Sequence, residues 1–492
     1  MQHGRDAHAT IEAVVLANGR RLACRAVVVT TGTFLRALMH TGESQTEGGR
    51  VGEAAAKGLS GCLQRLGLEL GRLKTGTPPR LDRKSIDFSA FEAQPGDEEP
   101  APFSFLNEYP SGAASKGAWK PPLQQIQCYI TNTTEDVHEI IRANLHRAPM
   151  YSGQIQSTGP RYCPSIEDKV VRFADKHAHH IFLEPEGLDT DEIYCNGIST
   201  SLPRDVQERI IPLIPGLSRA NIMRYGYAVE YDMVWPTQIR STLETKAVNG
   251  LFLAGQINGT SGYEEAAAQG LVAGINAVRY ATTSTADFTL TRDQSYIGVL
   301  IDDLVTKPPT EPYRMFTSRA EHRLHLRADN ADERLTKIGR DIGLVDDKRW
   351  NRFGARREMI TNALALLRET RLGAQPAYEL LRRPDVTFAD LRQKLPALEA
   401  VPGDVANLVE IQVKYDGYIA RQSKAIDRFA QLEHKLIPTS LDYAMVPGLR
   451  NEAKQKLAKF TPRSLGQALR ISGITPADVT VLAVHLDRPR RG

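Results

Sequence analysis

Short β-branched runs mark the strands expected in the first half of the chain. Residues 11–16 and 25–31 are two such runs, and the turn-like residues 17–20 between them predict a β-hairpin. The second run leads into Thr31-Gly32-Thr33, and the apolar run at residues 250–255 also ends in glycine. Two buried strands that end in small residues indicate an open α/β sheet, in which ligands lie at the carboxyl ends of strands.

Apolar positions recur with helical spacing in several other segments. Residues 53–70 carry leucines at this spacing, and residues 262–280 predict a helix of small side chains. Residues 71–80 hold glycines and two prolines, which exclude a regular helix there. Residues 126–131 alternate like a strand, residues 135–147 are typical of a helix, and the Pro-, Gly- and Ser-rich residues 92–122 predict a loop or an inserted excursion. After about residue 285 the periodic segments predict a mainly helical region, at 329–343, 349–371, 386–394 and 451–459.

Composition narrows the class of protein. The 492 residues are 41% hydrophobic and 24% charged, which is ordinary for a globular protein and excludes disorder as the main state. The chain has no apolar run near the ~18–20 residues that a membrane helix needs, and its polar start lacks the apolar core of a secretory signal. The five cysteines form no CxxC pair, so we expect a reduced, cytoplasmic protein without a membrane segment.

Charge is distributed unevenly along the chain. Residues 291–492 carry 34 Lys and Arg against 26 Asp and Glu, whereas residues 1–290 carry 28 against 32. A basic C-terminal part is compatible with a polyanionic partner. A solvated helical surface explains the same charges equally well.

The glycine-rich stretch from Leu253 to Gly270 is the first candidate site. A buried strand leads into a turn with several glycines and then into an alanine-rich helix. Glycines let backbone N–H groups approach an anion, and a helix N-terminus adds partial positive charge. Tight strand–helix packing without a ligand is the alternative. The polar side chains of Gln256, Asn258 and Thr260 beside the glycines favour a nucleotide site.

Cys163 is the second candidate. It stands between an Arg-Tyr pair and a Pro-Ser turn, and Ser165 can cap a helix that begins near Ile166. A thiol beside cations and a helix N-terminus has a lowered pKa and becomes a thiolate nucleophile. The remaining cysteines are interpreted as small buried hydrophobic residues: Cys24, Cys62, Cys128 and Cys195.

Two weaker clusters are interpreted structurally. The glycine-rich residues 48–53 with Arg72, Lys74 and Arg80 could hold phosphates, but a structured loop is the better expectation. His177, His179 and His180 could ligate a metal, but no further ligand group is evident. A solvated or hydrogen-bonded role is therefore expected for them, and no metal site is predicted.

Several long motifs resemble one family. Residues 159–169 (GPRYCPSIEDK), 255–266 (GQINGTSGYEEA), 312–324 (PYRMFTSRAEHRL) and 71–80 (GRLKTGTPPR) are similar to the GidA/MnmG family. The resemblance implies an α/β fold, with a Rossmann-like FAD-binding domain that is incomplete at its N-terminus, an inserted α+β NAD-binding domain and an all-α C-terminal domain. The implied boundaries are 1–85 and 201–285 for the FAD-binding domain, 86–200 for the inserted NAD(H)-binding domain, and 286–492 for the helical domain that would bind tRNA and partner.

The resemblance also implies a reaction. The family adds a (carboxymethyl)aminomethyl group to carbon 5 of the tRNA wobble uridine, using FAD, NADH and a methylene-tetrahydrofolate-type carbon donor. Its implied assembly is a homodimer joined in a heterotetramer with an MnmE-type GTPase. Cys163 matches a catalytic cysteine of the family, and the resemblance implies that its thiolate adds to carbon 6 of the uridine. The flavin-contacting positions implied are Ser60, Gly255, Gln256, Asn258, Gly259 and Thr260. The nicotinamide-binding stretch implied is Gly159, Pro160, Arg161, Tyr162, Cys163, Pro164, Ser165, Ile166, Glu167, Asp168, Lys169, Val170, Val171, Arg172 and Phe173.

One element of the family has no match. Its opening strand, GxGxxG turn and helix, with a second catalytic cysteine soon after, find no counterpart, and residues 1–60 contain no GxGxxG. We expect either a truncated product or gene model, or a separate chain that supplies the missing part. Two alternatives stay open: a folate- and FAD-dependent tRNA uridine-5 methyltransferase of the TrmFO kind, which lacks the long helical region, and a non-catalytic remnant that binds tRNA or a partner.

Overall fold

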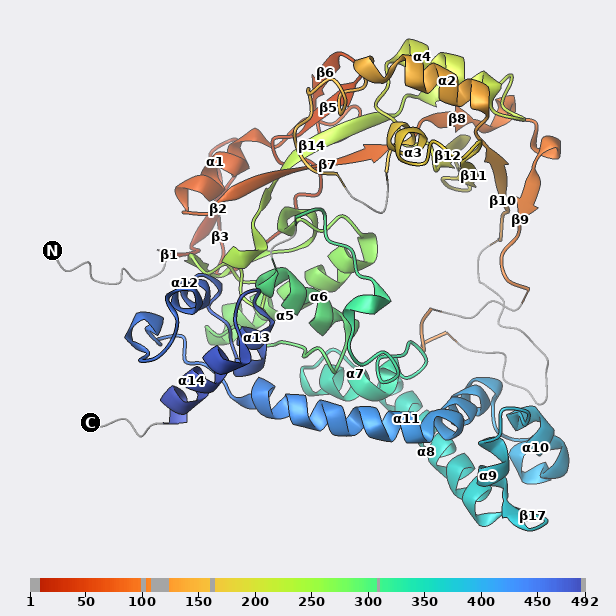
Figure 1. The fold of residues 1–492 in the computed structure, drawn as a ribbon, viewed down its shortest axis with the longest axis vertical. Coiled ribbons are helices and arrows are strands. Elements are labelled where there is room, and N and C mark those ends of the chain that lie inside the picture. Colours follow the sequence, from red (N-terminus) through yellow and green to blue (C-terminus); the bar gives the residue numbers. More distant parts are fainter. Residues whose placement is uncertain (1–8, 99–102, 108–123, 160–163, 308–309, 488–492) are drawn as a thin grey trace. The chain divides into compact units, whose positions relative to one another are not determined.

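A computed structural model describes residues 9–98, 103–107, 124–159, 164–307 and 310–487. Contacts divide the chain into two compact units. The first comprises Met1–Asp97, Leu123–Thr289 and Asp303–Arg314, and the second comprises Glu98–Pro122, Leu290–Asp302 and Met315–Gly492. Figure 1 shows mixed strands and helices in the first unit and mostly helices in the second.

A parallel strand pair and one long helix flank the glycine-rich turn that follows residue 253. Strand β4 (Val27–Val29) pairs in parallel with β16 (Leu251–Leu253), and α5 (Tyr263–Thr283) packs against both. Parallel strands need a crossover between them, so both carboxyl ends lie at one edge. Strand β1 (Ala9–Thr10) likewise pairs in parallel with β15 (Val248–Asn249).

The predicted hairpin is wrong in its second strand. Strand β2 (Ala13–Val15) pairs with β3 (Arg21–Ala23), while the run at 25–31 forms β4 instead. Gly19, at φ 80°, allows the tight reversal after residue 16. The turn therefore pairs residues 13–15 with residues 21–23, which follow it directly. The second β-branched run is then available to pair with residues 251–253. That run is also only half-buried, not buried as expected.

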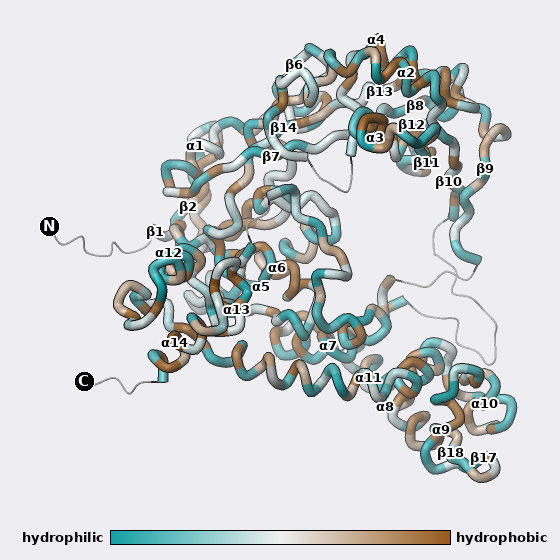
Figure 2. The backbone as a smooth tube through the Cα atoms, viewed as in Figure 1, coloured by the Kyte–Doolittle hydropathy of each residue, from teal (hydrophilic) through white to brown (hydrophobic). Residues whose placement is uncertain are grey.

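A six-stranded sheet, antiparallel throughout, also belongs to this unit. Its order is β13-β8-β12-β11-β10-β9. The strands are β8 (Arg80–Asp82), β9 (Glu92–Gln94), β10 (Cys128–Asn132), β11 (His180–Pro185), β12 (Glu192–Asn196) and β13 (Ile222–Arg224). Helices α2 (Glu135–Ala143), α3 (Ile166–Arg172) and α4 (Arg204–Ile210) bury their apolar residues in one core with this sheet, as their brown segments in Figure 2 illustrate. The sheet draws on residues 80–224, a wider range than the 86–200 expected for the inserted domain.

A four-stranded sheet completes the first unit. Its order is β6-β5-β14-β7, built from β5 (Leu38–Thr41), β6 (Ser44–Glu47), β7 (Leu70–Thr77) and β14 (Tyr227–Val234). Nearly every residue of β14 is buried. The segment 71–80 is not helical, as predicted, but most of it forms β7, so the loop expected around Arg72 and Lys74 is wrong. Helix α1 (Lys57–Arg65) precedes it and is shorter than predicted.

The second unit is helical, as predicted. The expected helices appear as α7 (Ala331–Asp341), α8 (Asp347–Glu369), α10 (Phe388–Lys394) and α12 (Asn451–Phe460). The others are α9 (Ala377–Leu381), α11 (Gly403–His434), α13 (Leu465–Arg470) and α14 (Pro476–Asp487), with a small hairpin of β17 (Arg371–Leu372) and β18 (Gln375–Pro376); α6 (Tyr296–Thr306) contains the unit boundary. Helix α11 supplies side chains to two apolar cores of this unit, and a smaller cluster forms around Val299, Ala320 and Leu326.

Candidate functional site

A glycine turn follows β16 and precedes α5. Residues Gly255–Asn258 form a single 3₁₀ turn, and Gly259 then adopts a left-handed conformation. Gly255 has φ 86°, and a Cβ there would lie 3.3 Å from the Cβ of Ala266 on α5. A side chain at either glycine would be strained, because these φ values favour glycine. The backbone therefore passes close to the first turn of α5, which is the tight strand–helix packing named above as the alternative to a ligand site.

The side chain of Gln269 on α5 is hydrogen-bonded to three residues of this turn. Its Oε1 accepts hydrogen bonds from the Gly255 N–H at 3.0 Å and the Asn258 Nδ2 at 2.9 Å. Its Nε2 donates to the Thr260 Oγ1 at 2.9 Å, and its side chain is fully buried. Gln269 was not among the residues predicted for the site. A long amide on the small-residue helix was the signal that could have found it, since a buried polar side chain needs partners.

Three buried oxygens around the turn accept no hydrogen bond within the described residues. They are the Gln256 Oε1, the Asn258 Oδ1 and the Thr31 Oγ1. Thr31 follows β4, and the two amides follow β16, so all three stand just past the carboxyl ends of paired parallel strands. A buried polar atom without a partner costs free energy of about 1–3 kcal/mol. A polar ligand at this edge would satisfy them, so a nucleotide fits the residues present.

Residues 313 and 314 contact the glycine turn and the first turn of α5. The Tyr313 N–H donates to the Gly259 carbonyl oxygen at 2.7 Å, and the Tyr313 hydroxyl donates to Asp303 at 3.1 Å. The Arg314 guanidinium lies 3.4 Å from the Glu265 carboxylate on α5. The motif at 312–324 thus begins beside the glycine turn, although no local sequence pattern connects the two.

Ser60, the remaining predicted flavin contact, is buried in α1. Its hydroxyl donates to Asp232 Oδ2 at 2.8 Å. The same carboxylate accepts from Arg72 at 2.9 Å and lies 3.4 Å from Arg36. Ser60 therefore belongs to a charge network on the four-stranded sheet, and the structure records no hydrogen bond between it and the described residues of the glycine turn.

The predicted nicotinamide-binding stretch is described only in part. Pro160, Arg161, Tyr162 and the predicted nucleophile Cys163 lie outside the described residues. Beyond them, Ser165 caps α3 as expected, because its Oγ accepts from the Asp168 N–H at 3.3 Å. Ile166, Glu167 and Val170 are buried in this helix, whereas Val171, Arg172 and Phe173 are exposed.

The weaker clusters behave mainly as structure. Arg72 pairs with Asp232, and the Arg80 guanidinium pairs with Glu186 and stacks on the Tyr194 ring. The His179 ring packs against that of His138, and no cluster of metal-ligating side chains occurs in the described ranges.

The cysteines follow their expectation unevenly. Cys195 is buried, and burial raises the pKa of its thiol, so it is a hydrophobic residue as expected. Cys24, Cys62 and Cys128 are only half-buried. The expectation of buried cysteines is therefore wrong for these three.

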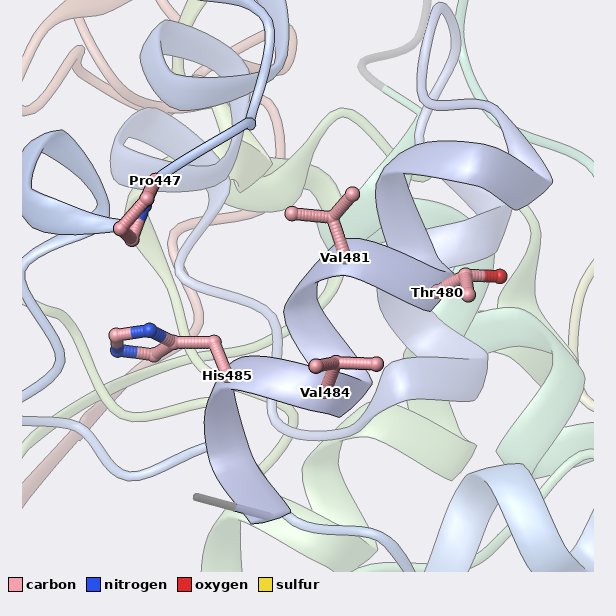
Figure 3. Close-up of a pocket in the computed structure, with 5 residues that line it drawn as sticks. All are labelled: Pro447, Thr480, Val481, Val484 and His485. Carbon is pink, nitrogen blue, oxygen red and sulfur yellow. The ribbon is translucent and has the colours of Figure 1, made fainter.

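A separate cavity of about 210 Å³ lies in the second unit. Its lining comprises Pro447, Thr480, Val481, Val484 and His485, and Figure 3 shows four of these on or beside α14. The walls are mostly apolar, and none of the predicted site residues contributes to them. Among the described residues, no helix combines the length and apolarity that a bilayer crossing requires.

The parallel strand pair, the glycine turn and α5 place the chain in the class of α/β proteins, in which ligands commonly bind past the carboxyl ends of parallel strands. Comparison with known proteins defines the family. Residues 4–285 match the family model described as glucose inhibited division protein A. Residues 347–423 and 425–492 match the models of the C-terminal helical domain and helical bundle of the tRNA modifying enzyme MnmG/GidA. The chain belongs to the GidA/MnmG family.

Similar proteins are found across bacteria. The chain is 54% identical over 466 residues to tRNA uridine 5-carboxymethylaminomethyl modification enzyme MnmG of Rhodopirellula baltica, covering 94% of this chain and 70% of the relative. It is 52% identical to the MnmG of Protochlamydia amoebophila, covering 96% and 75%. The form I crystal structure of Aquifex aeolicus GidA is 48% identical with a TM-score of 0.87, covering 97% of this chain and 80% of that one. The relatives are tRNA-modifying enzymes, and the family assignment makes this chain a member of an enzyme family.

Proposed function

We propose that this chain adds a (carboxymethyl)aminomethyl group to carbon 5 of the wobble uridine in tRNA. Its similarity to MnmG enzymes over nearly its whole length carries the proposal. The helical region after residue 286 supports this activity over a TrmFO-like methyltransferase, because it matches the two helical models of MnmG/GidA. This region is also the more basic part of the chain, which suits contact with tRNA phosphates.

FAD is the cofactor that we assign to the glycine turn. Gly255, Gln256, Asn258, Gly259 and Thr260 would hold it, and the unsatisfied oxygens of Gln256 and Asn258 supply acceptors for its polar groups. Gln269 fixes these residues in place before the cofactor arrives. Bound flavin would supply the redox chemistry, with NADH as reductant at residues 159–173 and a methylene-tetrahydrofolate as carbon donor.

Cys163 is the proposed nucleophile. Its thiolate would add to carbon 6 of the uridine, and the electron pair of the 5,6 double bond would then make carbon 5 nucleophilic toward the one-carbon unit. After carbon 5 has been substituted, loss of its proton would re-form the double bond and expel the thiolate. The uridine must leave its base stack to reach such a thiol. An MnmE-type GTPase, a homodimer of this chain and a cytoplasmic location complete the proposal.

Two measurements test the proposal. Purified chain is examined for flavin absorbance, and tRNA incubated with the chain, partner GTPase, NADH and folate donor is digested for nucleoside mass analysis. The aminomethyl product is expected, and a 5-methyl product would instead identify a methyltransferase. Cys163→Ser is expected to bind FAD and tRNA without modifying the uridine. A colourless, folded chain that binds tRNA and yields no product would identify a non-catalytic remnant.

A further inference from the structure

The middle of α11 belongs to neither of the two apolar cores that its ends supply. Val409 and Val413 are its last side chains in one core, and Leu432 is its first in the other. Residues 414–431 lie between them and span about 27 Å of helix. Single exposed apolar side chains need no explanation, but aromatic side chains that gather on one exposed stretch mark an interaction surface.

Three planar side chains follow one another along this stretch. Tyr415 and Tyr418 are 46% and 57% exposed, and their ring centroids lie 6.3 Å apart. The Arg421 guanidinium lies 4.7 Å from the centroid of the Tyr418 ring. An arginine at this distance attracts the ring through a cation–π interaction and so favours one orientation of it. Tyr415, Tyr418 and Arg421 together form a tyrosine–arginine surface that is organised before a ligand arrives.

Charge is unevenly distributed around the axis of α11. At 100° per residue, Tyr415 and Arg421 lie about 60° to either side of Tyr418. The exposed carboxylates of Asp416 and Asp427 lie about 160–180° from Tyr418, on the opposite face. Arg421 is exposed, and no ion pair is recorded for it within the described ranges. An anion that approaches the tyrosines therefore meets a cation without a competing carboxylate of α11.

A neighbouring segment of the same unit extends this face. The His325 N–H donates to the Gln422 Oε1 at 2.8 Å, and the His322 ring lies 6.1 Å from that of Phe429, which is 53% exposed. Gln422 and Phe429 lie within about 40° of the second tyrosine around the helix axis. Arg323, between the two histidines in sequence, is exposed and forms no ion pair with the part of the chain that the structure describes. A second available cation thus lies along the same face.

This combination of side chains favours RNA with unpaired bases over a duplex or a protein. Bases stack on aromatic rings and on the guanidinium plane of arginine, and every base offers a face for this contact. Bases inside a duplex are already stacked on each other, so only unpaired nucleotides can use such a surface. A duplex would have to be held through its phosphates, which needs many more cations than the two that are available here.

We propose that the tyrosine–arginine surface binds unpaired nucleotides of the tRNA, with bases stacked on Tyr415 and Tyr418 and a phosphate paired with Arg421. The proposal rests on the proposed function, in which tRNA is the substrate. It adds a binding site for RNA that is separate from the glycine turn. The middle of α11 is then a binding element, which explains why aromatic rings are exposed there.

The experiment measures the affinity of the full chain for fluorescently labelled tRNA by anisotropy, at a series of salt concentrations. Tyr418→Leu removes the ring but keeps an apolar side chain, and Tyr418→Phe keeps the ring without the hydroxyl. Arg421→Gln is compared with Arg368→Gln, because Arg368 on α8 is also exposed and lies 4.9 Å from the centroid of the Tyr378 ring. Met445→Ala removes another exposed side chain of this unit and is the control for Tyr418→Leu.

Tyr418→Leu is expected to weaken tRNA binding by about 10-fold, because one base stack is lost, whereas Tyr418→Phe should stay within about twofold of the parent chain. Arg421→Gln should lower the slope of log affinity against log salt by about 1, and Arg368→Gln should leave the slope unchanged. Circular dichroism checks that each variant is folded. Tyr415→Leu provides the same test of the surface if Tyr418→Leu does not fold.

Equal tRNA affinity in Tyr418→Leu and Met445→Ala would overturn the proposal. Weaker binding of the partner GTPase with unchanged tRNA affinity would also overturn it, and would assign this face to a protein. Binding is measured without NADH or carbon donor, so its result does not depend on catalysis. Ring-dependent affinity in a chain that never modifies uridine would refute the proposed function and leave the surface standing, whereas product formation with equal affinity in all variants would do the reverse.

Discussion

Replacing Gln269 by leucine tests the organisation of the glycine turn. Leucine keeps an apolar side chain of comparable size on α5 but removes both polar ends of the amide. The Gly255 N–H and the Thr260 hydroxyl then lose the partners that the structure records for them. The Asn258 Nδ2 keeps its bond to the Leu253 carbonyl oxygen at 2.8 Å and loses the other.

The size of the effect follows from these three losses. Each of the three lost hydrogen bonds costs about 1 kcal/mol, which gives roughly 3 kcal/mol in the free energy of unfolding. For a domain of 150–250 residues, about 1 kcal/mol lowers Tm by about 2–4 °C, so a decrease near 10 °C is expected. Flavin affinity should fall as well, because the turn that presents Gln256 and Asn258 is no longer held.

Calorimetry and flavin titration measure the two effects separately. Gln64→Leu, on the exposed side of α1, is the matched control and should change neither. An unchanged Tm together with unchanged flavin affinity in Gln269→Leu would refute the role of this amide. A lower Tm with full flavin affinity would limit Gln269 to stability.

Three further changes test other parts of the chain. Burial lowers the pKa of Lys246 from 10.5 to about 7, so between these pH values the unfolded chain holds a proton that the folded chain lacks. Stability should therefore rise with pH across that window, and Lys246→Met should abolish the slope and stabilise the fold at pH 7 by roughly 3 kcal/mol, as measured by urea unfolding at a series of pH values. Gly197→Ala, with φ 106° and a Cβ only 2.4 Å from a carbonyl oxygen, should destabilise by about 2 kcal/mol more than Gly153→Ala, where the Cβ meets nothing within 4 Å; equal midpoints in urea would count against this. Arg470→Leu leaves the buried Asp302 with fewer partners and should lower the free energy of unfolding by about 3 kcal/mol. A double variant with Asp302→Leu should recover part of this loss, and a double variant less stable than the single one would contradict the pairing.

The sequence predicted those features of the fold that depend on interactions between neighbouring residues, such as caps and turns. The Ser165 cap, the non-helical backbone at 71–80 and the strand–turn–helix around Gly255 all appear as expected. Pairing over long distances was harder, since nothing in residues 25–31 says that they pair with residues 251–253 rather than with the preceding run. The same limit applies to Gln269 and Tyr313. Their hydrogen bonds to the turn exist only because the folded chain brings α5 and residue 313 next to it, which no local pattern predicts.

Helix α11 was missed for a different reason. Its buried apolar side chains gather in the first third, at Val405, Val409 and Val413, while Tyr415 and Tyr418 are exposed. The remainder therefore shows no continuous apolar stripe of the kind that marks a helix in sequence. The charged and exposed middle of the helix is stabilised because each end of α11 packs in an apolar core, one that includes Val409 and one that includes Leu432.

The continuity of α11 sets the relative rotation of the two helical cores that it joins. Its 32 residues span about 48 Å, and the two C-terminal family models meet within it, at residues 423 and 425. Each residue added to its middle would turn one core about its axis by roughly 100° relative to the other and move it about 1.5 Å away. A seven-residue insertion would nearly restore the original phase while lengthening the spacing, so distance and angular register can be varied independently in this protein.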